Sequence, residues 1–414
     1  MPLFDHLKSL RAACAVSLTG SSMGAAQGLH VSQSSVTRAV QSLEDALQQV
    51  VFDRSARGMA VTPAWAELLQ RCVRALECLV MAPAPKAGTP PGHGWMACRL
   101  ALVVSPRHVR VLLSLAATGS ETVSAAQLGV SQSAVHQSLV QLEHFSGKTL
   151  FTRSRQHGLR VTEWGAQLIR GCKLFLSELA QADEVLAALS GRVAGRLVIG
   201  TLPFSVGPLL PMAVLRVLHD LPGLQVTVVD GTYDALIDQL RDAEIDLIVG
   251  ALRPEFAIQG LMQETLFVDG LAVVARAGHP LALQKKLSWR HLADAAWIMP
   301  MPNTPAQTVF ERALAREGLP LPAVPLRVNS ALMMQSLLMQ SDRLAMMSPR
   351  QIQSEIQAGL LVVLPLAVPQ AVRTIGLIRR SGILLTPGMQ SVLQACRQVA
   401  SEMVGENPLN KPNA

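Results

Sequence analysis

The sequence predicts a multidomain chain in which two small helical domains of one design precede a two-lobed α/β domain. The stretch Ala25–Arg57 returns as Ser124–Arg155 with matching residue types at matching positions. A Pro/Gly-rich segment, APAPKAGTPPGHG, separates the two copies and is typical of a linker. Beyond residue 191, short apolar runs alternate with helical patterns, which indicates a sheet that helices cover on both faces.

The two copies match in spacing as well as in residue type. The features that recur 99 positions later are Ser32 and Ser131, Val36 and Val135, Leu43-Glu44 and Leu142-Glu143, and Phe52 and Phe151. Two copies are too few for a solenoid, which needs a run of repeats to bury a continuous core. We therefore expect two separate domains.

A helical segment and a turn precede each copy. The segments Asp5–Ser17 and Pro106–Ala117 both lead into Thr-Gly-Ser, where Gly favours the end of one helix and Ser the N-cap of the next. A short helix, a turn and a longer helix then follow, and the longer helix has apolar residues three and four positions apart on one face. Thr62 and Thr162 are expected to cap a further helix.

The opposite face of the longer helix is polar at its start in both copies. It carries Ser32, Gln33, Ser34, Thr37 and Arg38 in the first copy, and Ser131, Gln132, Ser133, His136 and Gln137 in the second. Gln can bind adenine through two hydrogen bonds, Arg can bind guanine, and Ser or Thr can bond to bases or phosphates. A short helix, a turn and a longer helix with a polar start form the helix-turn-helix, whose second helix enters the major groove of DNA.

A basic loop follows the longer helix in both copies. Its cations are Arg54 and Arg57 in the first copy and Arg153 and Arg155 in the second, and each loop lies between two apolar anchors and ends in Gly. This pattern predicts a wing, a tight β-ribbon whose cations contact phosphates.

Both copies resemble the winged helix-turn-helix of LysR-type transcriptional regulators. The matching motif is TGS…AA…L-x-VSQ-S-x-V…LE…LF-x-R…G…VT. Everything from about Arg99 onward is similar to one whole member of that family, and the first ~95 residues look like an added head. The resemblance implies DNA binding, a dimer linker helix, and an effector-binding domain that is itself similar to periplasmic binding proteins.

The helix expected at residues 163–190 carries an apolar seam. Its members are Leu168, Cys172, Phe175, Leu179, Ala182, Leu186 and Leu189, spaced four and three apart. This spacing is the signature of pairing with another helix. We favour dimerisation, because a helix-turn-helix protein gains two half-sites that way, and the resemblance implies a homodimer or homotetramer. In the alternative, the seam packs on the chain's own domains.

The α/β region is expected to form two lobes. Strands at Arg196–Thr201, Gln225–Asp230 and Asp246–Gly250 with helices between them predict a parallel sheet, Phe267–Arg276 crosses to a second lobe, and Thr374–Arg379 returns. The predicted domains are residues 1–81, a linker at 82–98, residues 99–162, the helix at 163–190, and an effector-binding domain at 191–414, with lobe I at about 195–270 plus 373–404 and lobe II at about 271–372.

A ligand in such a clamp binds beyond the carboxyl ends of strands, near helix N-termini. The residues at those places are Thr201, Phe204, Ser205, Arg253, Asn303, Thr304 and Ser330. Free backbone N–H groups and hydroxyls favour a small anion such as a carboxylate. The alternative for each Ser or Thr is an ordinary N-cap.

Composition supports contact with DNA and argues against a metal or a membrane. Residues 1–190 hold 17 Lys and Arg against 12 Asp and Glu, whereas the rest holds 19 against 17. The six cysteines form no CxxC pair and the ten histidines show no metal spacing, so we expect no metal, no cofactor and cysteines that act as buried hydrophobes. No apolar run approaches the ~20 residues of a membrane span, and the N-terminus lacks a signal-peptide pattern, so we expect a cytoplasmic protein.

The leading hypothesis is a sequence-specific DNA-binding transcriptional regulator whose small-molecule effector, bound between the lobes, repositions the DNA-binding domains. An enzyme or solute-binding protein is disfavoured, because the sequence supplies no nucleophile, metal set or dinucleotide loop. A co-regulator whose helix-turn-helix domains bind protein is the alternative, and salt-dependent binding to duplex DNA separates the two.

Overall fold

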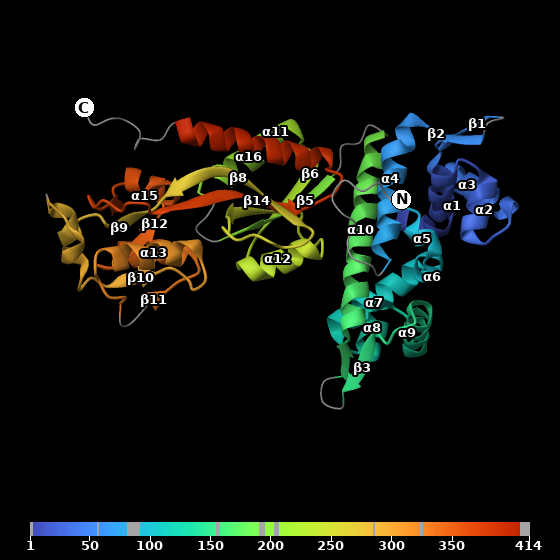
Figure 1. Cartoon of the computed structure of the whole chain (residues 1–414), viewed down its shortest axis with the longest axis horizontal. Coiled ribbons are helices and arrows are strands. Elements are labelled where there is room, and N and C mark those ends of the chain that lie inside the picture. The colour runs from blue at the N-terminus through green and yellow to red at the C-terminus, as the bar shows by residue number, and fades with distance from the viewer. Residues whose placement is uncertain are drawn as a thin grey trace. The chain divides into compact units, whose positions relative to one another are not determined.

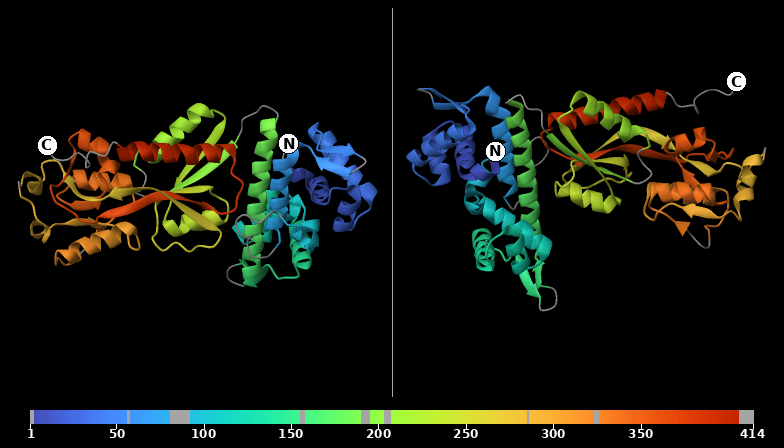
Figure 2. Two further views of the ribbon diagram at one scale, coloured as in Figure 1. Left: turned by 45° about the horizontal axis from the view of Figure 1, so that its top comes forward. Right: turned by 180° about the vertical axis from the view of Figure 1, so that it is seen from behind.

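The computed structural model describes residues 3–55, 58–80, 92–154, 158–189, 195–202, 207–284, 286–322 and 326–405 (Figures 1 and 2). The chain divides into two compact units. The first unit contains residues 1–195 and 382–386, and the second contains residues 196–381 and 387–414.

The first unit contains two bundles with the same order of elements. The first bundle consists of η1 (Leu3–His6), α1 (Leu7–Thr19), α2 (Ser22–Leu29), α3 (Gln33–Leu47), β1 (Phe52–Ser55), β2 (Gly58–Val61) and α4 (Pro63–Cys78). The second consists of α7 (Pro106–Thr118), α8 (Glu121–Leu128), α9 (Gln132–Ser146), β3 (Phe151–Ser154), β4 (Gly158–Val161) and α10 (Glu163–Leu189). Both follow the predicted order of three helices, a hairpin and a closing helix.

Glycines set the turns that hold each hairpin against its bundle. Gly20 and Gly119 end α1 and α7 in the left-handed conformation, with φ of 69° and 63°. Their carbonyls accept hydrogen bonds from the backbone N–H groups of Met59 and Leu159, at 2.9 and 2.8 Å. A Cβ atom at Gly58 would lie 2.6 Å from the carbonyl oxygen of Gly20, so the hairpin can approach this closely only with glycine there.

The two closing helices begin differently. The hydroxyl of Thr162 accepts from the backbone N–H of Gly165 at 3.0 Å and caps α10 as predicted. The hydroxyl of Thr62 instead donates to the carbonyl of Val50 at 3.2 Å and makes no cap bond. Pro63 occupies the first position of α4, where its fixed φ suits the helix start and its lack of an N–H leaves one donor fewer to satisfy.

The last residues of the predicted linker form part of a short helix. Residues 81–91 lie outside the described residues, but two short helices follow them, α5 (Gly94–Ala97) and α6 (Arg99–Val103). Trp95 is fully buried, and its backbone N–H donates to the carboxylate of Glu77 at 3.1 Å. The prediction of a linker extending to residue 98 is therefore wrong at its C-terminal end, because the Pro/Gly composition concealed a buried tryptophan anchor.

Helices α4 and α10 lie side by side and share one core (Figures 1 and 2). Leu68 and Cys72 of α4 and Cys172, Phe175 and Leu179 of α10 are each no more than 1% exposed. The α10 seam is thus buried from Leu168 to Ala182, packed with the chain's own α4, while Leu189 at its end is 40% exposed. Packing on the chain's own domains was the less favoured of the two alternatives. A heptad-like pattern identifies a face that must be buried, and it does not identify what buries it.

Most cysteines act as small apolar side chains, as expected. Cys14, Cys72, Cys172 and Cys396 are buried. Burial raises the pKa of the Cys172 and Cys396 thiols to about 12, so both stay protonated and poorly reactive.

The second unit contains two five-stranded sheets with crossovers between them. The first has the order β6-β5-β7-β14-β8, built from β5 (Gly195–Thr201), β6 (Leu224–Asp230), β7 (Leu247–Ala251), β8 (Leu261–Gly270) and β14 (Val372–Arg380). The second has the order β11-β10-β12-β9-β13, built from β9 (Ala272–Arg276), β10 (Trp297–Met299), β11 (Leu326–Arg327), β12 (Leu344–Met347) and β13 (Leu361–Val363). The chain crosses between the sheets at β8–β9 and returns in β14, so each sheet forms the centre of one lobe.

The sheets are mixed, whereas the sequence predicted parallel pairing. Strand β14 runs antiparallel to β7 and β8, and β9 runs antiparallel to β12 and β13. Strand β8 leads out of lobe I and β14 leads back into it, so the two strands are antiparallel. The sequence did not reveal this, because a buried apolar run has the same pattern in either direction.

Helices cover the sheets. In lobe I, α11 (Leu209–Asp220) and α16 (Pro387–Gly405) lie on one face and α12 (Tyr233–Arg241) on the other (Figure 1). Lobe II has α13 (Pro305–Arg316) and α14 (Ala331–Met339), together with η2 (Pro280–Leu283), η3 (Trp289–Leu292), η4 (Pro349–Ile352) and α15 (Gln353–Gln357). Within the described ranges no helix is long and apolar enough to cross a membrane.

Candidate nucleic-acid interface and effector pocket

Helices α3 and α9 present a polar face at their N-terminal ends. Ser32 and Ser131 cap them through bonds of 3.2 Å from the backbone N–H groups of Ser35 and Ala134. Apolar residues of the same helices, such as Val36 and Val135, are buried against the bundle cores. The residues on the outer face are all exposed: Ser32, Gln33, Ser34, Thr37 and Arg38, and Ser131, Gln132, Ser133, His136 and Gln137.

In the first bundle, local bonds arrange this polar face without burying it. The amide of Gln33 donates to the hydroxyl of Ser22 at 3.0 Å, and the hydroxyl of Thr37 donates to the carbonyl of Gln33 at 3.1 Å. The guanidinium of Arg38 donates back to the carbonyl of Ser34 at 3.3 Å. These are weak, solvent-exposed bonds, and a base or phosphate can replace them at little cost.

The β1–β2 hairpin brings Arg54 to the side of α3. Its guanidinium donates to Gln41 at 3.1 Å and to Glu44 at 3.2 Å, while half of the side chain remains exposed. The other carboxylate oxygen of Glu44 accepts the backbone N–H of Val51 at 2.9 Å. Glu44 therefore holds both the backbone at the start of the hairpin and its cation.

The second bundle repeats the backbone anchor but arranges its cations differently. Glu143 accepts the backbone N–H of Leu150 at 2.8 Å, as Glu44 does for Val51. Arg153 instead pairs with Glu121 at 2.9 Å, and the Nδ1 atom of His136 lies 3.2 Å from the same oxygen. Arg153 is 73% exposed, so it can turn toward a phosphate.

The second unit has a cavity of about 860 Å³ between its two lobes. Its wall is largely apolar, with Ile298, Met301, Met334 and Met346 among the lining residues. Arg253 lies in the segment just after β7 of lobe I, stacks on the ring of Tyr233 at 4.5 Å and donates to the backbone carbonyl of Asn303 in lobe II. A cation in an apolar cavity that spans two lobes suits a small organic anion.

Family models match most of the chain. The model described as "LysR substrate binding domain" matches residues 190–401. The model described as "Bacterial regulatory helix-turn-helix protein, lysR family" matches residues 7–64 and 106–166.

The chain belongs to the LysR family. It is a DNA-binding transcriptional regulator with an effector-binding domain, and its relatives are regulators rather than enzymes.

One relative matches almost end to end. The regulator GalR of Pseudomonas putida is 33% identical over 96% of this chain and 98% of its own length. The regulator PcaQ of Agrobacterium fabrum is 27% identical over 72% of this chain and 95% of its own. The GalR match therefore includes the long N-terminal region, whereas the PcaQ match leaves about a quarter of this LysR regulator uncovered.

Solved structures share the fold. A full-length OxyR variant from Pseudomonas aeruginosa covers 71% of this chain and 95% of its own, with a TM-score of 0.53 and 20% identity. CbnR, a LysR family regulator, covers 71% and 98%, with a TM-score of 0.52 and 17% identity. Like the PcaQ match, each spans nearly a whole relative but under three quarters of this chain.

The cavity of this LysR regulator contains only part of the predicted effector set. Arg253, Asn303 and Thr304 line it, whereas Phe204 and Ser205 lie outside the described residues. Thr201 and Ser330 do not line it, since Thr201 bonds to Asp230 and Ser330 caps α14. Thr304 caps α13 through a 3.2 Å bond from the backbone N–H of Gln307, so its hydroxyl also has the ordinary helix-start role.

Several polar lining residues were not in the predicted effector set, among them Tyr233, Gln351 and Arg373. Tyr233 supports Arg253, and the buried Arg373 lines the cavity while paired with Asp269 at 3.0 Å. Both amide atoms of Gln351 are buried without a hydrogen-bond partner. No local motif marks Gln351, because the fold alone brings η4 to the cavity.

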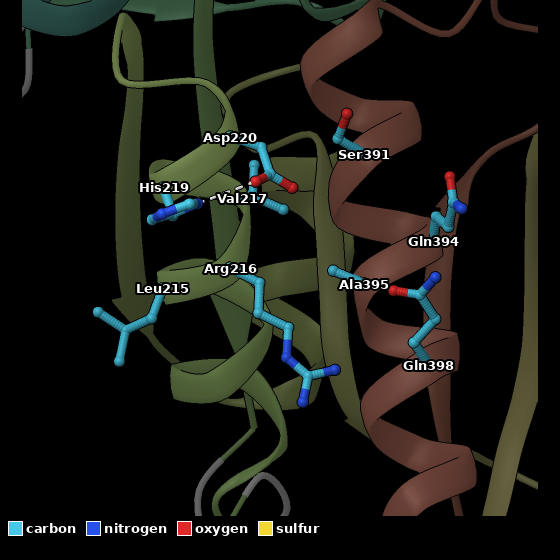
Figure 3. A pocket seen from close by; sticks show the side chains of 9 residues that line it. All are labelled: Leu215, Arg216, Val217, His219, Asp220, Ser391, Gln394, Ala395 and Gln398. Carbon is cyan, nitrogen blue, oxygen red and sulfur yellow. Dashed lines mark hydrogen bonds and ion pairs between the residues drawn. The ribbon is translucent and has the colours of Figure 1, made fainter.

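Other hollows and clusters are less suited to an effector. A hollow of about 510 Å³ lies between α11 and α16, where Arg216 and Gln398 come from facing helices and Leu215 points away (Figure 3). It belongs to one lobe only, so a ligand there would not bridge the clamp. Among the described residues no group of three or more His, Cys, Asp or Glu is placed to hold a metal ion. Two of the hairpin cations predicted to contact phosphates, Arg57 and Arg155, fall outside the described residues.

Proposed function

We propose that both bundles are winged helix-turn-helix domains that dock on duplex DNA. The start of α3 and of α9 would enter successive major grooves, and the two hairpins would lie along the phosphates. The observation that carries this proposal is the double occurrence of an exposed Ser-Gln-Ser helix start beside an exposed hairpin arginine, Arg54 or Arg153.

Salt dependence of binding tests the proposal. Full-length protein should bind a mixed-sequence duplex with a log–log salt slope of roughly −0.9 per neutralised phosphate. Arg153→Ala should lower that slope by about one. Gln167→Ala, an exposed change on α10, serves as the control and should leave the slope unchanged. Binding that ignores salt, or no binding to duplex, would favour the alternative of a co-regulator that recognises protein.

We propose further that a small carboxylate binds in the cavity between the lobes and controls DNA binding. Arg253 is the candidate partner for the carboxylate, Gln351 supplies an unpaired amide, and the apolar wall accepts a hydrocarbon body. Because the ligand would touch both lobes, it would favour the closed arrangement in proportion to its differential affinity for it.

A panel of aliphatic and aromatic carboxylates, with their neutral amides as matched controls, tests the ligand class. A true ligand raises the unfolding midpoint of the full-length protein, because it binds only the folded state. Arg253→Ala should abolish the shift, and Arg312→Ala, an exposed arginine on α13, should not. If amides bind as well as acids, the carboxylate assignment is wrong.

Association of chains into a homodimer or homotetramer is proposed through the second unit. Most of the α10 seam is buried against the chain's own α4, whereas α11 exposes Met212 and Leu215 and strand β6 exposes Val228. The site of action is proposed to be the cytoplasm, where bacterial DNA lies. Sedimentation of Leu215→Glu against the unsubstituted chain tests the surface, and an unchanged oligomeric state would refute it.

A further inference from the structure

The pairing of α4 with α10 is antiparallel. The guanidinium of Arg71 donates to Gln181 at 2.9 Å, and that of Arg74 pairs with Glu178 at 3.2 Å. Farther along, a Cβ atom at Gly171 would lie 2.5 Å from the carbonyl oxygen of Cys78. As residue numbers rise on α4 they fall on α10, and glycine allows the two backbones to approach closely.

Equivalent positions of the two copies supply both sides of the interface between α4 and α10. The matching pairs, 100 positions apart, are Leu68 and Leu168, Cys72 and Cys172, and Leu79 and Leu179. All six side chains lie in one apolar core and are no more than 1% exposed. Equivalent surfaces that pack antiparallel form the arrangement of an isologous dimer, here made within one chain.

Contacts beyond the seam fix the two bundles to each other. The backbone N–H of Leu3 donates to Asp183 at 2.9 Å, and the ring of Phe4 packs edge-on against Phe175 at 6.0 Å. The buried guanidinium of Arg11 on α1 donates to the carbonyls of Ala101 and Val104 beyond the first bundle, at 2.7 and 2.5 Å. Figure 1 shows α3 and α9 on the same side of the α4–α10 pair.

The two polar faces are similar but not identical. Gln33 and Gln132 match, and so do the serines on either side of them. Thr37 and Arg38 of the first bundle are replaced by His136 and Gln137 in the second. Arg favours guanine and Gln favours adenine, so the two faces call for different bases at that position.

We propose that one chain is a complete DNA-reading unit that recognises two unlike half-sites in a non-palindromic operator. The inference rests on the proposed DNA-binding function and adds its stoichiometry and specificity. A protein that pairs two identical chains through its linker helices presents two identical faces and selects a palindrome. This chain presents two different faces in a fixed relation, so each half-site has its own bundle.

Selection from a pool of random-sequence duplexes tests the proposal with the full-length protein. The pool must be long enough for two half-sites one or two helical turns apart. The enriched sequences should contain two unlike half-sites at fixed spacing. Native mass spectrometry of the protein–duplex complex should then show one protein chain for every two half-sites. A duplex with the same half-site at both positions should bind at least about tenfold more weakly.

Single substitutions assign each half-site to a bundle. Arg38→Ala should relax base preference in one half-site only, and Gln137→Ala in the other only, each with a loss of roughly tenfold in affinity. Gln70→Ala and Gln167→Ala, exposed changes on α4 and α10, are the matched controls and should change neither. All four residues are exposed, so an unchanged unfolding midpoint verifies folding.

The possible failures are distinguishable. A palindrome occupied by two chains, with Arg38→Ala silent, would overturn the inference and leave the second bundle as the sole reader. Enrichment of no sequence, together with no salt-dependent binding, would overturn the proposed DNA-binding function itself.

Discussion

The two bundles share a scaffold and differ in how their charged side chains are held. In both, a glutamate at the same position of the long helix accepts the backbone N–H that opens the hairpin, Glu44 at 2.9 Å and Glu143 at 2.8 Å. In the first bundle that glutamate also holds the hairpin arginine, whereas in the second Arg153 turns to Glu121. In the first copy, Ser22 occupies the position that corresponds to Glu121, and its hydroxyl accepts a hydrogen bond from the amide of Gln33. The difference teaches that the fold is fixed by backbone anchors, while the exposed polar side chains on α3 and α9 are free to diverge.

The largest expected effect comes from breaking the seam that joins the bundles. Phe175 is fully buried against α4, at the position where the first copy has Ala75. Phe175→Ala should lower the free energy of unfolding by about 3–5 kcal/mol, because it removes apolar contacts and leaves a cavity. Denaturant unfolding measures the change. Val140→Ala, an exposed change on α9, should lower the free energy of unfolding by no more than about 0.5 kcal/mol. Equal effects of the two substitutions would contradict the burial of Phe175 between α4 and α10.

Removal of the hairpin anchors should weaken both bundles alike. Glu44→Ala and Glu143→Ala each leave a backbone donor of the hairpin without its carboxylate, at a cost of about 1–3 kcal/mol. Amide hydrogen exchange should accelerate at Val51 and Phe52 in one variant and at Leu150 and Phe151 in the other. Faster exchange in both hairpins of a single variant would show that the bundles do not unfold independently.

A change at Glu121 should sharpen the contrast between the bundles. Glu121→Gln removes a negative charge that pairs with Arg153 and His136, so both are freer to face phosphate. Affinity for a mixed-sequence duplex should rise by roughly two- to fivefold at low salt, and the salt slope should steepen. Titration by fluorescence anisotropy measures both. Glu317→Gln makes the same change of charge at an exposed site in the second unit, and an equal gain there would refute a local effect.

The element order and the exposed faces could be predicted because they depend on local patterns. The Thr-Gly-Ser turns, the serine N-caps and the apolar spacing each act within a few residues, and the structure follows them. The cover on the α10 seam, the burial of Trp95 and the direction of β14 depend on contacts between distant segments. Gln351 of the cavity belongs to the same class, since nothing beside it in the sequence marks it.

The smallest expected effect is a pH dependence at the junction of the bundles. Burial raises the pKa of Asp183, against the opposing effect of its bond from the Leu3 N–H. A carboxyl whose pKa is raised in the folded state adds stability below its unfolded pKa, and that contribution is lost as pH rises through the folded value. Unfolding free energy should therefore fall slightly from acid toward neutral pH, and Asp183→Asn should flatten that trend. Asp238→Asn, an exposed change on α12, should leave it intact.

Charge reversal across the seam tests the central claim, that α4 and α10 of one chain pair with each other. Glu178 is only 9% exposed, so Arg74→Glu should cost about 3 kcal/mol or more by placing two carboxylates together. The account predicts that Glu178→Arg restores the unfolding midpoint when both changes are in one chain. It also predicts no recovery when chains carrying only Arg74→Glu are refolded together with chains carrying only Glu178→Arg. Recovery in that mixture would show that the helices pair between chains and would contradict the account.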